Sequence, residues 1–353
     1  MAFIKLSPDK SQFRIAALGH KTQTRPYIMR SAFPLLACYK KLGTALKAQH
    51  FLDRTMDLGF DGVRLFGETW AIDKSSAFFG NPKYTPHLSI VQNGAPANSS
   101  VEILKNYWDL VDALTEDLEQ RDMIAEFCVI ATIKDQHPGM QTHLLNNVAQ
   151  GFAEGFDAKQ CPYIFETVNE WDAYSSLTAD EVRMMGPRWR RNEPGHPMEK
   201  NFPGSLIGVS GGGDWSPGFD DSGYTHRNIH PPRGTEWDKG FYIKGKPRGP
   251  LGAALAETLA AAGGRPVAFN ETVHCWTKEQ RQEWEPRAPK WVGLSTTDVK
   301  RHAAYSLDVL RAGISLAFHD LYGMSVVMAN KQPFTPFEES MRDVIVEMRS
   351  TWK

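Results

Sequence analysis

The stretch 162–171, Pro-Tyr-Ile-Phe-Glu-Thr-Val-Asn-Glu-Trp, is a short, mostly apolar run that ends in polar side chains. Apolar runs of this length are typical of strands that are covered on both faces, as in parallel sheets. Further short apolar runs occur both before and after it in the chain. The eight predicted strands span residues 14–18, 62–66, 123–130, 162–168, 205–210, 225–229, 266–270 and 314–318.

Helical patterns lie between these runs, with apolar residues spaced three and four apart. Strand and helix alternate about eight times, which predicts an α/β fold, a (β/α)8 TIM barrel with long loops on its C-terminal face. No GxGxxG follows the first strand, which disfavours the alternative of an open doubly wound sheet. The predicted helices span residues 101–121, 142–156, 251–261, 298–311 and 336–350, and the predicted long loops span 70–100, 185–203 and 230–248.

The chain shows no repeat and no linker that would divide it, so residues 1–353 are expected to form a single domain. The 40 Lys and Arg residues nearly balance the 41 Asp and Glu residues, which gives no case for nucleic acid or an anionic membrane as the main partner. No apolar run is long enough for a transmembrane helix. The sequence pattern leaves the oligomeric state open.

The first residues lack the apolar core of a secretory signal. We therefore expect a cytoplasmic or leaderless protein, with release by lysis left open. The cysteines Cys38, Cys128, Cys161 and Cys275 are widely spaced and form no CxxC pair, so they are expected to be buried thiols.

The polar residues at strand ends are the candidate site, because barrel enzymes place their active sites at the C-terminal ends of the strands. The fourth strand ends in Asn169 and Glu170, and the seventh ends in Glu271. Two glutamates at these positions would face each other across the barrel mouth. Further polar residues near strand ends are Arg64 in the second strand, Asn228 and His230 after the sixth, and His319 and Asp320 after the eighth.

Two carboxylates across a cleft can hydrolyse a glycosidic bond. One protonates the departing oxygen, and the other attacks the anomeric carbon or activates water. The two groups need different pKa values and therefore different surroundings. Arg64 could keep one carboxylate ionised, and Asn169 could bind a sugar hydroxyl.

This set of residues resembles glycoside hydrolase clan A, the family-5-like cellulases and mannanases. The resemblance rests on Gly62-Val63-Arg64 in the second strand, Asn169-Glu170 after the fourth and Glu271 after the seventh, and it covers roughly residues 10–330. It implies retaining hydrolysis of β-glycosidic bonds with no metal or cofactor. In it, Glu170 is the general acid/base, Glu271 is the nucleophile, Arg64 supports Glu271, and Asn169 contacts the sugar 2-hydroxyl.

The sequence also departs from the clan pattern. The third strand ends in Val129-Ile130-Ala131-Thr132, where clan members often have a histidine. No tyrosine follows Asn228 and His230 at the sixth strand, where a His-x-Tyr is common. His319 follows the eighth strand, where many members have a tryptophan. These differences bear on the sugar-binding subsites more than on the reaction.

The long aromatic loops favour an oligosaccharide or polysaccharide as substrate. Tryptophans that follow strand ends could stack on sugar rings, although each could equally pack a loop. The residues leave the sugar, the linkage and endo or exo action open. The predicted substrate-binding residues are Arg64, Asn169, Trp171, Trp215, Asn228, His230, Trp276 and His319.

Two other readings remain open at this point. A metal-dependent barrel hydrolase could use His20, His226, His230 and Asp320 as ligands, although its usual His-x-His is replaced by Gly-His20-Lys. A carbohydrate-binding barrel without turnover would keep the fold and the sugar contacts only.

Overall fold

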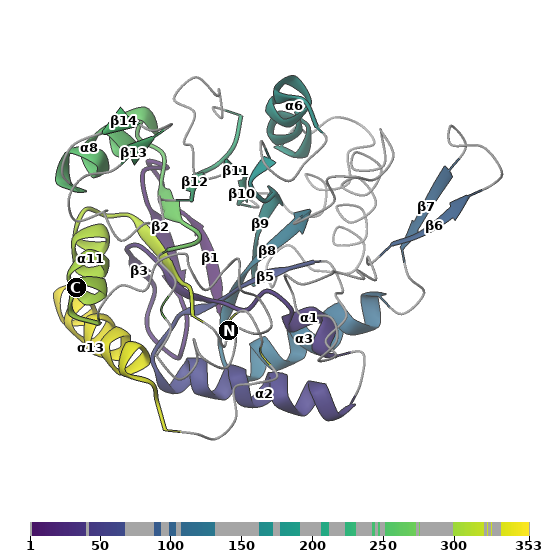
Figure 1. Ribbon diagram of the computed structural model, residues 1–353, viewed down its shortest axis with the longest axis horizontal. Helices are drawn as coiled ribbons and strands as arrows, with labels where there is room; N and C mark the ends of the chain where they lie inside the picture. Colours follow the sequence, from purple (N-terminus) through teal and green to yellow (C-terminus); the bar gives the residue numbers. More distant parts are fainter. Residues whose placement is uncertain are drawn as a thin grey trace.

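The computed structural model describes residues 2–39, 42–67, 88–92, 99–103, 107–130, 162–171, 177–190, 206–211, 223–230, 242–243, 246–247, 251–272, 275, 299–320, 323, 326 and 333–352. One sheet of parallel strands dominates the molecule (Figure 1). Its strands are β4 (Ile28–Ser31), β5 (Gly62–Phe66), β8 (Ile124–Ile130), β9 (Tyr163–Val168), β10 (Ile207–Gly208), β11 (Ser210–Gly211), β12 (Arg227–Ile229), β15 (Val267–Phe269) and β16 (Ser315–Phe318).

The sheet closes into a barrel. The hydrogen-bonded order is β10-β9-β8-β5-β4-β16-β15-β12-β11, so β10 and β11 stand at its two ends. Only Val209 separates β10 from β11 in the chain, which makes them two halves of one strand. Eight parallel strands therefore form a closed (β/α)8 barrel, and the predicted fold is confirmed.

The prediction of the first strand was wrong. Residues 13–16 form β2 (Phe13–Ala16), which pairs antiparallel with β1 (Phe3–Leu6) and β3 (Gln23–Thr24) outside the barrel. The alternation of buried and half-buried residues in β2 is typical of an antiparallel strand with one solvated face. Apolar residues of this hairpin pack on inward-facing residues near the starts of the barrel strands, and so close the N-terminal end. The cluster contains Ala2, Ile4, Phe13, Ile15, Ala17, Tyr27, Met29, Ile124, Ile164, Leu206 and Ala268.

The helices surround the barrel. They are α1 (Leu35–Cys38), α2 (Leu42–Asp57), α3 (Tyr107–Gln120), α6 (Ala179–Arg190), α8 (Leu251–Ala261), α11 (Val299–Arg311) and α13 (Pro336–Thr351). The predicted helices at 251–261, 298–311 and 336–350 are confirmed as α8, α11 and α13.

Other segments differ from the predictions. The helix predicted at 101–121 begins at Tyr107, because Ser99–Ile103 forms β7 against β6 (Leu88–Gln92). The helix predicted at 142–156 lies outside the described residues. α6 occupies the start of the loop predicted at 185–203, and β13 (Tyr242–Ile243) pairs with β14 (Lys246–Pro247) within the loop predicted at 230–248.

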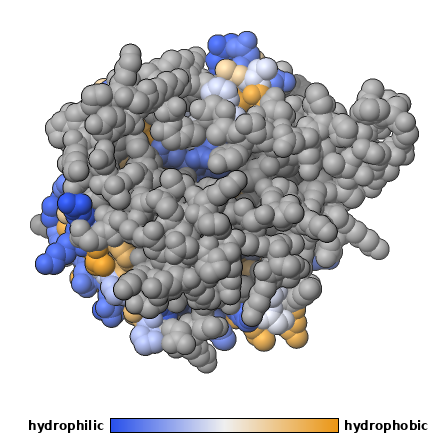
Figure 2. All heavy atoms as spheres, viewed as in Figure 1, coloured by the Kyte–Doolittle hydropathy of each residue, from blue (hydrophilic) through white to orange (hydrophobic). Residues whose placement is uncertain are grey.

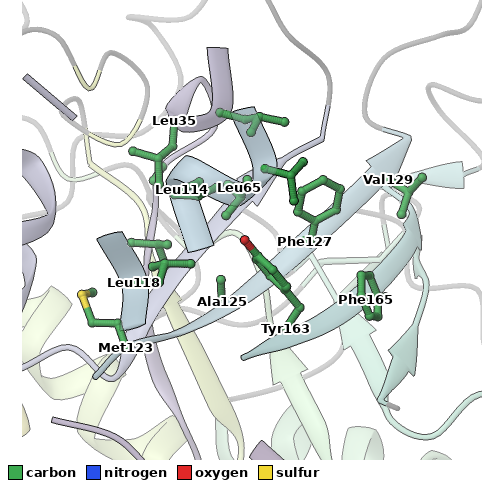
Figure 3. Close-up of a cluster of buried hydrophobic side chains, with 14 of the residues drawn as sticks. Leu35, Leu65, Leu114, Leu118, Met123, Ala125, Phe127, Val129, Tyr163 and Phe165 are labelled. Carbon is green, nitrogen blue, oxygen red and sulfur yellow. The ribbon is translucent and has the colours of Figure 1, made fainter. Parts of the chain in front are cut away.

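The space between the strands and the helices holds the hydrophobic core. Figure 3 shows side chains of α3 such as Leu114 and Leu118 meeting Phe127 of β8 and Tyr163 of β9. Burying one large apolar side chain contributes about 1.5–3 kcal/mol, so this layer fixes the strands that carry the site. A second core lies between β15, β16 and the helices α11 and α13.

Gly62 shows why the β5 sequence needs a glycine. A Cβ atom at this position would lie 1.7 Å from the carbonyl oxygen of Ile124 in β8. Only glycine allows the two strands to approach this closely. The close pairing sets the position of Arg64, which is two residues further along β5 and faces the same side.

Buried ion pairs tie α13 to the barrel. Arg30 of β4 binds Asp320 after β16 at 2.5 Å and Glu338 of α13 at 2.7 Å, and Arg54 of α2 also binds Glu338. Although burial raises the pKa of Glu338, Arg30 and Arg54 lower it to about 2. Two guanidinium groups thus balance two carboxylates in this network.

None of the described helices has both the length and the apolar character needed to cross a bilayer. The described cysteines, Cys38, Cys128 and Cys275, are free and buried, as expected, and Cys161 lies outside the described residues.

Candidate active site

Glu170 and Glu271 meet at the C-terminal mouth of the barrel. Glu170 follows β9, and Glu271 follows β15. One carboxylate oxygen of each and one ring nitrogen of His230 all lie within 4.8 Å of one another. The side chains of Glu170 and Glu271 are 12% and 6% exposed, so both keep a small contact with solvent.

The backbone aims Glu170 into the mouth. Its φ angle is 43°, in the left-handed region that residues other than glycine rarely adopt. Its backbone N–H donates to the hydroxyl of Ser210 at 2.9 Å, and its carboxylate lies 2.8 Å from Nδ1 of His230. Such strained residues occur often at functional sites, where the surrounding contacts hold them in place.

Arg64 is the cation at the centre of the site. It is fully buried and donates from Nη1 to Glu271 at 3.0 Å and from Nη2 to Glu166 at 2.6 Å. Burial lowers the pKa of Arg64, but Glu166 and Glu271 outweigh burial and hold this pKa well above its ordinary value. The contact with Glu271 that the resemblance implies is therefore present.

Asn169 is oriented by the same guanidinium. Its Oδ1 accepts from Nη2 of Arg64 at 2.7 Å, and the residue is 4% exposed. Arginine has only donors, so the amide oxygen must face Arg64. The amide NH₂ is then the group that can donate to a ligand.

The other described candidates lie around this centre. His230 bridges the two acids, with Nδ1 also 3.9 Å from Oε2 of Glu271. Asn228 is two residues earlier in the chain and lies deeper in the barrel, where it donates to Glu126 at 2.8 Å. The ring of His319 packs 5.0 Å from that of Phe33. The roles of Asn228 and His319 in substrate binding stay predictions.

The three candidate tryptophans are placed differently. Trp171 is half-buried and packs against the outer hydrophobic core. Trp215 and Trp276 lie outside the described residues. The stacking role of all three tryptophans stays a prediction.

The ligand set of the metal-hydrolase alternative was wrong, because three of its four residues have partners elsewhere. His20 lies 2.8 Å from Arg349, and Asp320 pairs with Arg30. His226 is buried with its ring 5.6 Å from that of Phe13. Burial and Arg265 lower the pKa of His226 to about 3, so it stays neutral at pH 7.

Several buried polar residues beneath the mouth were not predicted from the sequence: Glu126, Glu166, Ser210 and Asn270. Glu126 and Glu166 each interrupt a run of buried, mostly apolar strand residues. A lone carboxylate in such a run is a usable signal, because buried charges need partners.

In Figure 2, hydrophilic residues gather at the middle of the visible face, over the position of β10, β11 and β12 in Figure 1.

Solved structures share this architecture. A family 5 glycoside hydrolase, a mannosidase from Rhizomucor miehei, matches 99% of this chain and 100% of its own, with a TM-score of 0.58 and 10% identity. A β-glucanase from Saccharophagus degradans matches 98% of this chain and 94% of its own, with a TM-score of 0.58 and 14% identity. The chain has the fold of these hydrolases.

An endo-1,4-β-mannanase from Rhizomucor miehei gives a TM-score of 0.57 and 12% identity over 98% of this chain and 99% of its own. The chain spans 55% and 63% of two longer proteins from Bacteroides vulgatus that it also matches. No protein-family model matches the sequence, and no curated protein matches it. These similarities establish the fold alone. Any function has to be inferred from the residues at the mouth of the barrel.

Proposed function

We propose that the protein is a retaining β-glycoside hydrolase, with Glu170 as general acid/base and Glu271 as nucleophile. The observation that carries this proposal is the closeness of the two acids, because one carboxylate oxygen of Glu170 lies within 4.8 Å of one carboxylate oxygen of Glu271. Retaining enzymes hold their two carboxyl groups about 5–5.5 Å apart, whereas inverting enzymes need about 6.5–9.5 Å to admit a water molecule. The spacing here favours direct attack by a carboxylate.

The reaction then proceeds in two displacements. The Glu271 carboxylate forms a bond to the anomeric carbon while Glu170 donates its proton to the leaving oxygen, and the glycosidic bond breaks. Water next attacks the anomeric carbon as Glu170 takes one proton from it. The ester bond to Glu271 breaks, and the sugar leaves with its original configuration.

The surroundings of the two acids fit these different roles. Glu271 accepts a hydrogen bond from Arg64 through Oε1, and a neighbouring cation favours the ionised form that a nucleophile needs. The carboxylate of Glu170 instead lies 2.8 Å from Nδ1 of the His230 ring. Two acids in unlike environments can divide the roles of nucleophile and proton donor.

We propose an oligosaccharide or polysaccharide as the substrate. The Asn169 amide, held by Arg64, is positioned to donate to a sugar hydroxyl beside the reacting carbon. The structural neighbours include a mannosidase, an endo-1,4-β-mannanase and a β-glucanase, and one mannosidase was solved with mannosyl-fructose. Mannans and glucans are therefore the first substrates to test.

Reducing-sugar release from β-mannans, β-glucans, xylans and aryl β-glycosides tests this function. We expect hydrolysis of at least one substrate, and a loss of about 10²–10⁴-fold or more in both Glu170→Ala and Glu271→Ala. The exposed Glu119 of α3 provides a matched control, and Glu119→Ala should match wild type.

Two outcomes would contradict the proposal. Hydrolysis that survives both substitutions would remove the carboxylate pair from the mechanism. Sugar binding without product, unchanged by Glu271→Gln, would support a carbohydrate-binding barrel without turnover.

A metal-dependent hydrolase is a second candidate, because Glu170, His230 and Glu271 are also close enough to share one ion. Histidine nitrogens and glutamate oxygens are both among the groups that bind zinc. Chelation followed by addition of Zn²⁺ or Mn²⁺ separates the two candidates. The carboxylate mechanism predicts unchanged activity, and a loss that the metal restores would favour the metal enzyme.

A further inference from the structure

We propose that Glu126, a residue below the mouth, is a positioning residue that works in its protonated form. It holds the strand ends that carry Glu271 and His230. The protonation of Glu126 does not depend on the proposed function. The effect of Glu126 on turnover does rest on that function.

Glu126 joins three strands and the segment before a fourth. It is fully buried near the start of β8, and its Oε1 accepts from Nδ2 of Asn228 at 2.8 Å and from Nδ2 of Asn270 at 2.6 Å. Its Oε2 lies 3.2 Å from the hydroxyl of Tyr27. Asn270 directly precedes Glu271, and Asn228 lies two residues before His230. The Glu126 side chain therefore holds the residues that lie just before Glu271 and His230.

Among the residues that the structure describes, the charges around Arg64 do not balance. Glu166, Glu271 and Glu126 approach this one guanidinium at 2.6, 3.0 and 3.9 Å. The α13 network, in contrast, pairs two guanidinium groups with two carboxylates. A buried carboxylate without a counter-charge is strongly unfavourable, so one acid of this group should hold a proton.

Glu126 is the acid best placed to hold that proton. It is the farthest from Arg64, and its three hydrogen-bond partners are neutral groups. Its burial and the charge of Glu166 raise the pKa of Glu126 to about 8. Among the described residues, the titratable and charged groups around it are Tyr27 before β4, Arg64 of β5 and Glu166 of β9, and Glu271 after β15 is linked to it through Arg64.

Both forms of the side chain can be mimicked. Glutamine matches a protonated carboxyl, because its Oε1 accepts from the two asparagine amides and its NH₂ donates to Tyr27. Leucine has a similar volume but makes none of these bonds. The pair Glu126→Gln and Glu126→Leu therefore separates hydrogen bonding from simple filling of space.

Thermal unfolding between pH 5 and pH 9 tests the proton directly. In wild type the folded protein keeps the proton up to about pH 8, whereas an unfolded glutamate loses it near 4.5. Wild type should therefore lose stability as the pH rises through this window, and Glu126→Gln should lack this loss. The unfolding midpoint of Glu126→Gln relative to wild type should rise steadily from pH 5 to pH 8. A constant difference across this range would show an ionised Glu126 and overturn the proposal.

Turnover at pH 6.5 tests the positioning role. We expect Glu126→Gln to keep kcat within about threefold of wild type, and Glu126→Leu to lose about 10²-fold, as misplacement of a reacting group by about 1 Å does. Circular dichroism confirms that each variant is folded. A Gln variant that falls as far as the Leu variant would contradict the role. If no glycoside is hydrolysed at all, the proposed function fails while the unfolding experiment still decides the proton.

Discussion

Replacing Glu271 with alanine is expected to lower kcat on any hydrolysed β-glycoside by about 10⁴-fold or more. The substitution removes the atom that forms the bond to the anomeric carbon, while Glu170 and Arg64 stay in place. It also leaves a space beside the sugar that a small anion such as azide can enter. Azide should then restore product formation in one displacement and give a glycosyl azide of inverted configuration, which NMR identifies.

Glu170→Ala is the matched variant. Its nucleophile is intact, so azide can attack the glycosyl-enzyme from the opposite face and give a glycosyl azide of retained configuration. The two variants should thus yield azides of opposite configuration from the same activated aryl glycoside. Identical products, or no response to azide in either variant, would contradict the assigned roles.

Replacing Arg64 with methionine is expected to lower the free energy of unfolding at pH 7 by about 3–5 kcal/mol, because it leaves buried carboxylates without their cation. Urea denaturation measures this change. Without the guanidinium, the buried acids bind protons more readily when folded than when unfolded. The loss should therefore be smaller at pH 5 than at pH 8.

Two controls accompany this variant. Arg183 and Asp180 form an exposed ion pair. We therefore expect Arg183→Met to change the free energy of unfolding by only about 0–1 kcal/mol. Arg64→Lys keeps the charge but cannot hold Glu166, Asn169 and Glu271 at once, so it should recover stability more than turnover. Wild-type stability of Arg64→Met at pH 7 would show that Arg64 is not the cation that balances the site.

Most of the barrel could be predicted from the sequence, because its strands are short apolar runs between amphipathic helices. The first strand was missed because Arg30 interrupts a run of four residues, and no local pattern reveals that Asp320 and Glu338 balance its charge. The neighbouring segment with Phe13 and Ile15 has better strand character. It forms the hairpin that closes the opposite end of the barrel.

The residues at the mouth could be predicted by position, since Glu170 and Glu271 directly follow two of the predicted strands. The layer beneath them could not. Glu126 contacts Asn228 and Asn270, which are more than 100 residues away in the sequence, and only closure of the barrel brings them together. Whether a single charged side chain points into the barrel also depends on the register of its strand. A strand that is buried on both faces does not reveal this register in its sequence.

A covalent sugar on Glu271 tests the central claim most directly. In aryl 2-deoxy-2-fluoro-β-glycosides of glucose, mannose and xylose, the fluorine slows both displacements. A good aryl leaving group restores the rate of the first displacement only, so the sugar stays bound to the enzyme. Mass spectrometry of the intact protein and of its peptides should find one sugar added to wild type, on the peptide that contains Glu271, and none on Glu271→Gln. A sugar on another residue, or hydrolysis of the parent glycoside with inversion and no adduct, would contradict the account.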